Sequence, residues 1–443
     1  MERADLVIEN GTVLTMDPDN RVIEDGFVAV RGDTLAAVGA APPGEAPEAA
    51  RRIDARGGLV LPGLVNAHTH AAMTLFRGLA DDLPLMEWLE QYIFPAEGRM
   101  DAGFVRAGTL LACAEMILSG TTTFCDMYLF EEQVAEAARS AGMRCLVGEV
   151  LYDFPSPSYG PIEKGFEHTE ALIADWRDDP LVSIAVEPHA IYTCSPDLIK
   201  RARDIALKHD VPLIMHVAET RTEIDQVREM YGKRPFEHLE ALGVLGPHLI
   251  ADHCVHLDEP EMDRIAAHGV RAVHNPESNM KLASGISPVS ELLARGVTVG
   301  LGTDGCASNN NLDLFGEMDT AAKLQKVDTM DPTDLDAAAV LRMATVEGAR
   351  ALGLGDVTGS LEVGKKADVI VIDTHKPHLT PLYNPFSHLV YAARAQDVAH
   401  SVINGRLVME NRTLGGLDVE RIMEEARRRA GDVMRWTGSG REG

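Results

Sequence analysis

Two histidines separated by one residue end a strand-like apolar segment near the start of the chain. The segment reads Leu61-Pro-Gly-Leu-Val-Asn-Ala-His-Thr-His70. Because side chains two positions apart on a strand share a face, His68 and His70 can bind one ion. Imidazole nitrogens are good ligands for zinc and similar metals. Alone, the pair also fits two polar residues at the exit of a strand, so the motif needs further ligands nearby.

Other potential ligands and acid–base groups follow apolar segments further along the chain. They are His189, His216, Glu219, His253 and Asp304. Each alone has an ordinary explanation, such as a turn cap for His189, a core imidazole for His253 or an Asx-turn for Asp304. Their recurrence at the ends of successive predicted strands instead indicates one shared site.

A set of three histidines and one carboxylate suits Zn²⁺ or a similar divalent ion with one open coordination position. The predicted ligands are His68, His70, His216 and Asp304. Glu219 is then free for proton transfer. A lysine that could bridge a second metal after carboxylation is absent from residues 182–189, so one ion is the simpler prediction.

The intervening sequence alternates apolar strands with segments of helical periodicity. We predict strands over Leu59–His68, Thr121–Asp126, Arg144–Val150, Val182–Glu187, Pro212–Val217, His248–His253, Val270–His274 and Val297–Thr303. Helices are predicted over, for example, Glu131–Ala141, Pro196–His209, Glu223–Leu242 and Glu259–His268.

Eight β-α units in about 300 residues indicate an α/β fold, a (β/α)8 TIM barrel, whose active site lies at the carboxyl ends of the strands. A doubly wound open sheet is the structural alternative. No Gly-x-Gly-x-x-Gly follows the first strand, which argues against a dinucleotide site.

Both ends of the chain show short strands with tight turns. Residues 4–38 alternate apolar and polar positions, and residues 364–373 and 400–409 repeat the pattern, with Asn-Gly turns at Asn10 and Asn404. We expect the two ends to pair into one small discontinuous β-sandwich domain. The predicted domains are 1–58 and 361–418 for this β-sandwich, 59–360 for the barrel and 419–443 for a C-terminal helix.

The composition excludes several classes of partner. The chain of 443 residues has 68 acidic against 41 basic residues, a net charge of -27, which repels nucleic acid and anionic membranes. The six cysteines form no Cys-x-x-Cys pair, and no signal peptide or long uncharged apolar run is present. We therefore expect a cytoplasmic protein with buried thiols. Charged residues on the last helix leave a homo-oligomer open.

Taken together, the motifs resemble the amidohydrolase superfamily and, within it, the 5-methylthioadenosine/S-adenosylhomocysteine deaminases. The resemblance covers nearly the whole chain. Its carriers are Pro62–His70, Phe94–Arg99, His216–Thr220, Asp252–Leu257, His274–Leu282 and Gly302–Asn310.

The resemblance implies a role for each candidate residue. His68, His70, His216 and Asp304 are the metal ligands, Glu219 carries protons, His253 orients the attacking water, and Glu97 and His189 contact the substrate. Glu97 would reach ribose hydroxyls, although its local sequence alone predicts a solvated acid after Pro95. An arginine that the family places near the end of the third strand is missing from 148–151, so the preferred 5′ substituent stays open.

The implied reaction is hydrolytic deamination of the adenine ring of 5′-methylthioadenosine, S-adenosylhomocysteine or adenosine, which gives an inosine-type product and ammonia. One divalent ion per subunit is expected, Zn²⁺ first and Fe²⁺ or Mn²⁺ as alternatives, and it would lower the pKa of its bound water from 15.7 toward ~7. Glu219 would then protonate ring N1 while Asp304 accepts a proton from the water.

Two alternatives stay open. The first is another deaminase or chlorohydrolase of the superfamily that acts on a free base or a triazine ring, with the same metal and a different substrate. Glu97 distinguishes this alternative from a nucleoside deaminase, because a free base or a triazine has no ribose for Glu97 to bind. An inactive barrel-shaped scaffold would be expected to lose ligands, yet all are present. The Pro-Cys-x-x-Cys signature of cytidine-type zinc deaminases is absent.

Overall fold

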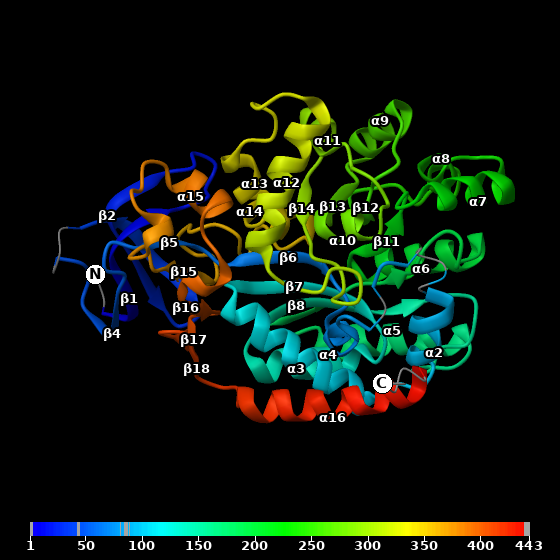
Figure 1. Cartoon of the computed structure of the whole chain (residues 1–443), viewed down its shortest axis with the longest axis horizontal. Helices are drawn as coiled ribbons and strands as arrows, with labels where there is room; N and C mark the ends of the chain where they lie inside the picture. The colour runs from blue at the N-terminus through cyan, green and yellow to red at the C-terminus, as the bar shows by residue number, and fades with distance from the viewer. Residues whose placement is uncertain (1–2, 42–44, 80, 84–86, 88, 438–443) are drawn as a thin grey trace.

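Parallel strands surround a common core in the computed structural model, which describes residues 3–41, 45–79, 81–83, 87 and 89–437. The barrel strands are β6 (Leu64–Thr69), β7 (Thr121–Tyr128), β8 (Arg144–Leu151), β9 (Val182–Ile184) with β10 (Glu187–Pro188), β11 (Leu213–Val217), β12 (Leu249–His253), β13 (Arg271–His274) and β14 (Val299–Leu301). Figure 1 shows these strands at the centre, with helices on their outside.

Hydrogen bonds close the strands into a cylinder. Strands β6 to β10 form one parallel ladder and β11 to β14 a second. Ile214 N–H donates to the Val186 carbonyl at 3.0 Å and joins the two ladders, while Asp304 N–H donates to the His68 carbonyl at 3.0 Å and joins the last strand to the first. The predicted TIM barrel is therefore confirmed and the open-sheet alternative is wrong.

Helices cover the outside of the barrel, and several of them begin at a capping residue. They are α3 (Ala102–Leu118), α4 (Glu131–Ala141), α5 (Ile162–Trp176), α6 (Pro196–His209), α7 (Arg221–Tyr231), α8 (Pro235–Ala241), α9 (Glu259–His268), α10 (Pro276–Lys281), α11 (Val289–Ala294), α12 (Leu314–Thr329), α13 (Ala337–Met343) and α14 (Val346–Ala351). Ser195 caps α6 and Asp258 caps α9 by accepting backbone N–H bonds. Shorter elements are η1 (Ala71–Phe76), η2 (Leu89–Ile93), α2 (Phe94–Glu97), η3 (Pro377–Leu379), η4 (Ala395–Asp397) and α15 (Pro385–Tyr391).

Two predicted elements are corrected. The single helix over Glu223–Leu242 is instead α7 and α8, because Gly232 ends α7 with φ +67° and Pro235 starts a new helix. The single strand over Leu59–His68 is interrupted at Gly63, where a Cβ atom would lie 2.1 Å from the Thr122 hydroxyl. Its first part is β5 (Leu59–Pro62), which pairs outside the barrel.

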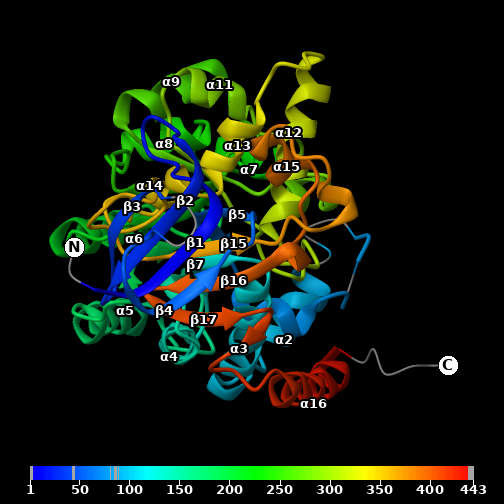
Figure 2. The ribbon, with the colours of Figure 1, turned by 90° about the vertical axis from the view of Figure 1, so that its left-hand side faces the viewer.

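Both termini contribute to one nine-stranded sheet beside the barrel. Its other strands are β1 (Ala4–Leu14), β2 (Val22–Arg31), β3 (Thr34–Ala40), β4 (Ala49–Asp54), β15 (Val369–Ile372), β16 (Val398–Ile403), β17 (Arg406–Glu410) and β18 (Thr413–Leu414). Leu35 exchanges backbone hydrogen bonds with Lys365 and Gly364, so the sheet curls around an apolar interior that includes Ile8, Val28 and Val369. Strand β5 lies between β1 and β15, and Figure 2 shows the strands of the two ends together on this side of the molecule.

The predicted pairing of the two ends is confirmed, and the sheet also includes β5. The residue boundaries of the domains stay a prediction. The C-terminal helix α16 (Val419–Thr437) lies along α3, where the Trp436 and Phe104 ring centroids are 5.4 Å apart. None of the helices in the described ranges has the length and apolarity needed to cross a bilayer.

A buried ion pair joins the barrel to the curled sheet. Arg144 Nε on β8 lies 2.9 Å from Asp368 Oδ2, just before β15, and both side chains are buried. Arg144 also donates to the Pro180 carbonyl and to Asn404 Oδ1. The arginine therefore holds the two sheets together.

Removing one partner of this pair should destabilise the fold strongly. Asp368→Ala leaves a buried guanidinium without its carboxylate, and we expect a loss of about 3–5 kcal/mol in the free energy of unfolding. The matched control is Glu410→Ala, which removes the carboxylate of the exposed Arg51–Glu410 pair and should cost about 0–1 kcal/mol. Chemical denaturation of both variants measures the difference. Equal losses would show that the buried pair does not hold the domains together.

Candidate active site

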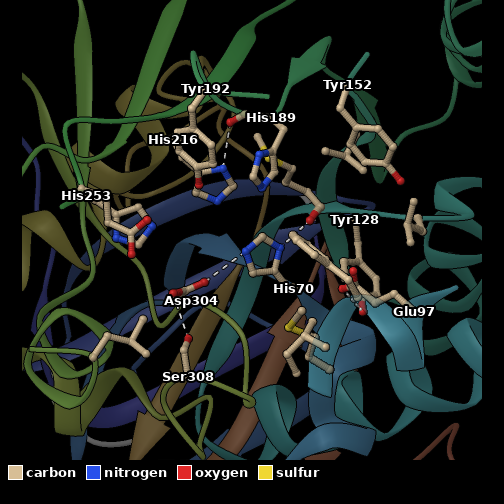
Figure 3. A pocket seen from close by; sticks show the side chains of 18 of the residues that line it. His70, Glu97, Tyr128, Tyr152, His189, Tyr192, His216, His253, Asp304 and Ser308 are labelled. Atoms are coloured by element: carbon tan, nitrogen blue, oxygen red, sulfur yellow. Dashed lines mark hydrogen bonds and ion pairs between the residues drawn. The ribbon is translucent and has the colours of Figure 1, made fainter. Parts of the chain in front are cut away.

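The predicted metal ligands meet at the carboxyl ends of the barrel strands. His68 lies near the end of β6 and His70 follows this strand, His216 lies in β11, and Asp304 follows β14. The ring centroid of His68 is 4.9 Å from that of His70 and 5.0 Å from that of His216. Figure 3 shows His70, His216, His253 and Asp304 converging on one side of a pocket.

Contacts on the far side of each ring orient the three imidazoles. Nδ1–H of His216 donates to the His189 carbonyl at 3.0 Å, and Nδ1–H of His70 donates to the Met127 carbonyl at 2.5 Å. Nδ1 of His68 lies 3.0 Å from Asp252 Oδ2. All three rings therefore direct Nε2 toward the shared space, in the tautomer that a metal ligand requires.

Asp304 faces the same space with one carboxylate oxygen. Its Oδ1 lies 3.1 Å from His70 Nε2, while Oδ2 accepts hydrogen bonds from Ser278 Oγ at 2.6 Å and Ser308 Oγ at 2.9 Å. Its backbone has φ +61°, which turns the side chain inward after β14. Burial favours the neutral acid, but His68 and His70 outweigh this effect and hold the pKa of Asp304 well below its ordinary value.

The donor set fits a divalent cation. Donor atoms of His68, His70 and His216 lie within 4.8 Å of one another, and so do those of His68, His253 and Asp304. Nε2 of His68 is buried and forms no hydrogen bond with the described residues. Burial lowers the pKa of His68, but Asp252 and Asp304 raise it to about 10, so this pocket favours a positive charge at its centre. Three imidazoles and a carboxylate are a ligand set that zinc accepts.

Glu219 enters the pocket from the loop that follows β11. The backbone N–H groups of Ala218 and Glu219 donate to the two carboxylate oxygens of Glu223, each at 2.8 Å, which fixes the loop although Ala218 has φ +58°. The Glu219 side chain is buried, and burial raises its pKa. Glu219 is thus a carboxyl group that retains a proton more readily than an exposed glutamate.

His253 and His189 complete the polar part of the pocket. His253 ends β12 with φ +71°, and its Nδ1–H donates to Asn279 Oδ1 at 2.9 Å. His189 follows β10, with Nδ1 2.9 Å from Thr193 Oγ1. Burial, reinforced by His70, lowers the pKa of His189 to about 3, so this imidazole is neutral and can exchange hydrogen bonds with a ligand.

Glu97 lies in the pocket and not on a solvated surface, so the expectation from its local sequence is wrong. It ends α2, and its Oε1 accepts a hydrogen bond from the Tyr128 hydroxyl at 2.8 Å. Burial raises the pKa of Glu97, against the opposing effect of Tyr128. Figure 3 shows Glu97 and Tyr128 across the pocket from His253 and Asp304.

The sequence prediction missed the aromatic wall of this pocket. Its walls include Tyr128, Tyr152 and Tyr192. Each of these tyrosines ends or follows a barrel strand, so the strand-end rule that found the histidines could also have found them. Apolar and aromatic walls with a few polar groups suit a small organic ligand.

Three comparisons with known proteins agree with this geometry. Residues 59–408 match the amidohydrolase family. The chain is 65% identical over 426 residues to the 5-methylthioadenosine/S-adenosylhomocysteine deaminase of Syntrophobacter fumaroxidans, covering 96% of this chain and 97% of that protein. An adenosine deaminase from Xanthomonas campestris, solved with bound zinc, has 42% identity and a TM-score of 0.96 over 98% of this chain and 99% of its own.

A more distant solved structure shares the fold. The atrazine chlorohydrolase of Arthrobacter aurescens TC1, solved with zinc, is 26% identical with a TM-score of 0.89, covering 96% of this chain and 100% of its own. The family match spans the whole barrel and part of the terminal sheet, and the similarity to the two deaminases extends over 96–98% of the chain. The chain therefore belongs to the amidohydrolase family.

Proposed function

We propose that this protein catalyses the metal-dependent hydrolytic deamination of adenosine-type nucleosides to inosine-type products and ammonia. The observation that carries the proposal is the two-ended pocket. One end holds the imidazole and carboxylate cluster with Glu219, and the other holds the Glu97–Tyr128 pair. A purine ring at the cluster would place its ribose toward Glu97, whose carboxylate accepts hydrogen bonds from hydroxyl groups.

The ligand chemistry supports one divalent ion per subunit. His68, His70, His216 and Asp304 would hold it, with Zn²⁺ as the first candidate and Fe²⁺ or Mn²⁺ as alternatives. When bound, such an ion lowers the pKa of water at the site and so supplies a nucleophile at neutral pH.

The protein's own residues then move the protons. Asp304 accepts a proton from the water that His253 orients, while Glu219 donates its proton to ring N1 as the new C6–O bond forms. Asp304 passes its proton to the amino group, the C6–N bond breaks and ammonia leaves. The C6 hydroxyl proton returns to Glu219 as the carbonyl forms. His189, being neutral, is suited to a hydrogen bond with the bound nucleoside.

The cellular setting is a second part of the proposal. All six cysteines are buried and unpaired, which fits a reducing compartment, and we propose a cytoplasmic location. The net charge of -27 argues against nucleic acid as a partner. Association into a homo-oligomer stays a prediction.

The substrate class is tested by an ammonia-release screen. We expect turnover of adenosine, 5′-deoxyadenosine and 5′-methylthioadenosine, and no comparable turnover of guanine, cytosine or an aminotriazine. Glu97→Ala should lower kcat/KM for the nucleosides by about 10- to 100-fold, because a hydrogen bond to a charged group is lost. Unaltered kinetics in Glu97→Ala, or preferred turnover of a free ring, would favour a base- or triazine-directed hydrolase instead.

Glu219 is tested by an isosteric change. Glu219→Gln cannot shuttle a proton, so we expect kcat to fall by about 10²- to 10⁴-fold while the variant retains its metal. Elemental analysis checks the metal, and a pH–rate profile checks the remaining activity. Near-normal turnover in a metal-loaded variant would exclude Glu219 from the chemistry.

Metal binding is tested independently of turnover. His216→Ala should bind less Zn²⁺ than the unchanged protein in elemental analysis and calorimetry, because one imidazole ligand is lost. His209→Ala is the matched control, since His209 pairs with Glu170 away from the pocket. A chelator should abolish ammonia release, and added Zn²⁺ should restore it. Full activity in a preparation shown to be metal-free would contradict the proposal.

A further inference from the structure

A second chamber lies beside the inner pocket. This outer chamber is lined by Phe94, Phe154, Tyr192, Thr193, Gln226, Glu229 and Met230. The first three of these residues also line the inner pocket that contains the candidate metal ligands. The two chambers are therefore neighbours that share one wall.

The shared wall is aromatic and held in place. The rings of Tyr152 and Phe154 stack with centroids 3.9 Å apart and an interplanar angle of 14°. Tyr152 is buried, whereas the Phe154 side chain is 44% exposed. Phe94 and Met230 are also exposed apolar side chains at this chamber. An apolar surface kept open in this way favours an apolar ligand group.

The outer chamber offers no cation to a ligand. Among the described residues that line either chamber none is a lysine or an arginine, and the acidic side chains are those of Glu97, Glu219, Asp304 and Glu229. A ligand carboxylate in the outer chamber would gain no cationic partner and would lie near the Glu229 carboxylate. An ammonium group could pair with Glu229, but that contact would not satisfy a carboxylate on the same tail.

The positions of Phe94 and Glu97 show where the outer chamber lies relative to the proposed ribose site. Both belong to α2, so the apolar wall begins within one helical turn of the residue assigned to the ribose. Tyr192 lies beside His189, with ring centroids 5.9 Å apart. A ribose held at Glu97 therefore has the outer chamber within reach of its 5′ carbon.

Building on the proposed nucleoside deamination, we propose that the outer chamber binds the 5′ substituent and selects an uncharged, apolar group over one that carries a carboxylate. The preferred chemistry is that of 5′-methylthioadenosine, whose thioether methyl can pack on the Phe154 and Tyr192 rings. The disfavoured chemistry is the zwitterionic amino-acid tail of S-adenosylhomocysteine.

The first test compares kcat/KM for these two nucleosides and adenosine. We expect 5′-methylthioadenosine to exceed S-adenosylhomocysteine by about tenfold or more, the size expected for a carboxylate left unpaired. Comparable values, or a preference for S-adenosylhomocysteine, would overturn the selectivity while leaving the deaminase proposal intact, provided that adenosine is deaminated. If no nucleoside is deaminated, both proposals fail.

Two variants assign the selectivity to the outer chamber. Glu229→Arg supplies a cation, and we expect the ratio of kcat/KM for S-adenosylhomocysteine to that for adenosine to rise about tenfold. Asp328→Arg is the matched control, because it changes the net charge equally at an exposed position of α12 that lines neither chamber. Phe154→Ala should lower the ratio for 5′-methylthioadenosine to adenosine by about 3- to 10-fold, as one aromatic contact is lost.

The ratios separate this role from a structural one, because a general loss of folding would lower all substrates together. Ratios that stay within twofold in both Glu229→Arg and Phe154→Ala would overturn the assignment of the 5′ substituent to the outer chamber. So would an equal rise in Asp328→Arg, since the effect would then follow net charge and not position.

Discussion

The hydrogen bond from Asp304 N–H to the His68 carbonyl is the contact on which the site depends. It joins the last barrel strand to the first, and it does so between two proposed ligand residues. Asn66 reinforces the junction by exchanging hydrogen bonds with Thr303. Residues more than 230 positions apart are thereby fixed at one point of the closed cylinder. The contact that joins the last strand to the first therefore also places two of the candidate ligands side by side.

Neighbouring strands then determine the direction of each imidazole. The Met127 carbonyl on β7 orients His70, the His189 carbonyl after β10 orients His216, and Asp252 on β12 lies against His68. A metal site built in this way needs little reorganisation, because the outer partners hold the rings before any ion arrives. A parallel barrel favours this arrangement, because adjacent strands end at the same level. A backbone carbonyl at the end of one strand can therefore orient a side chain at the end of the next.

Most of the fold could be predicted from the sequence because the residues that begin and end its helices and strands act locally. The bounds of α4, α6 and α9 were predicted to the residue, since capping residues and glycines mark their ends. The interruption at Gly63 was missed because the sequence is apolar on both sides, and only the pairing partners differ. The convergence of the candidate ligands was predictable from residue type at strand ends. The local sequence of Glu97 did not predict its place in the pocket, because the position of an acid on a short helix depends on tertiary packing. The tyrosines were overlooked, although the strand-end rule applies to them as well.

The division of labour between the two carboxyl groups follows from their surroundings. Asp304 and Glu219 are both buried in one pocket, so burial pushes the pKa of each upward. Asp304 has two imidazoles and two hydroxyl donors on its oxygens, and they hold it ionised. The loop of Glu219 directs its backbone N–H groups to Glu223, which leaves them unable to stabilise the Glu219 carboxylate. In the proposed reaction, Asp304 would therefore accept a proton and Glu219 would donate one. Environments that push two pKa values apart assign the base and the acid, which is what ring protonation with water attack requires.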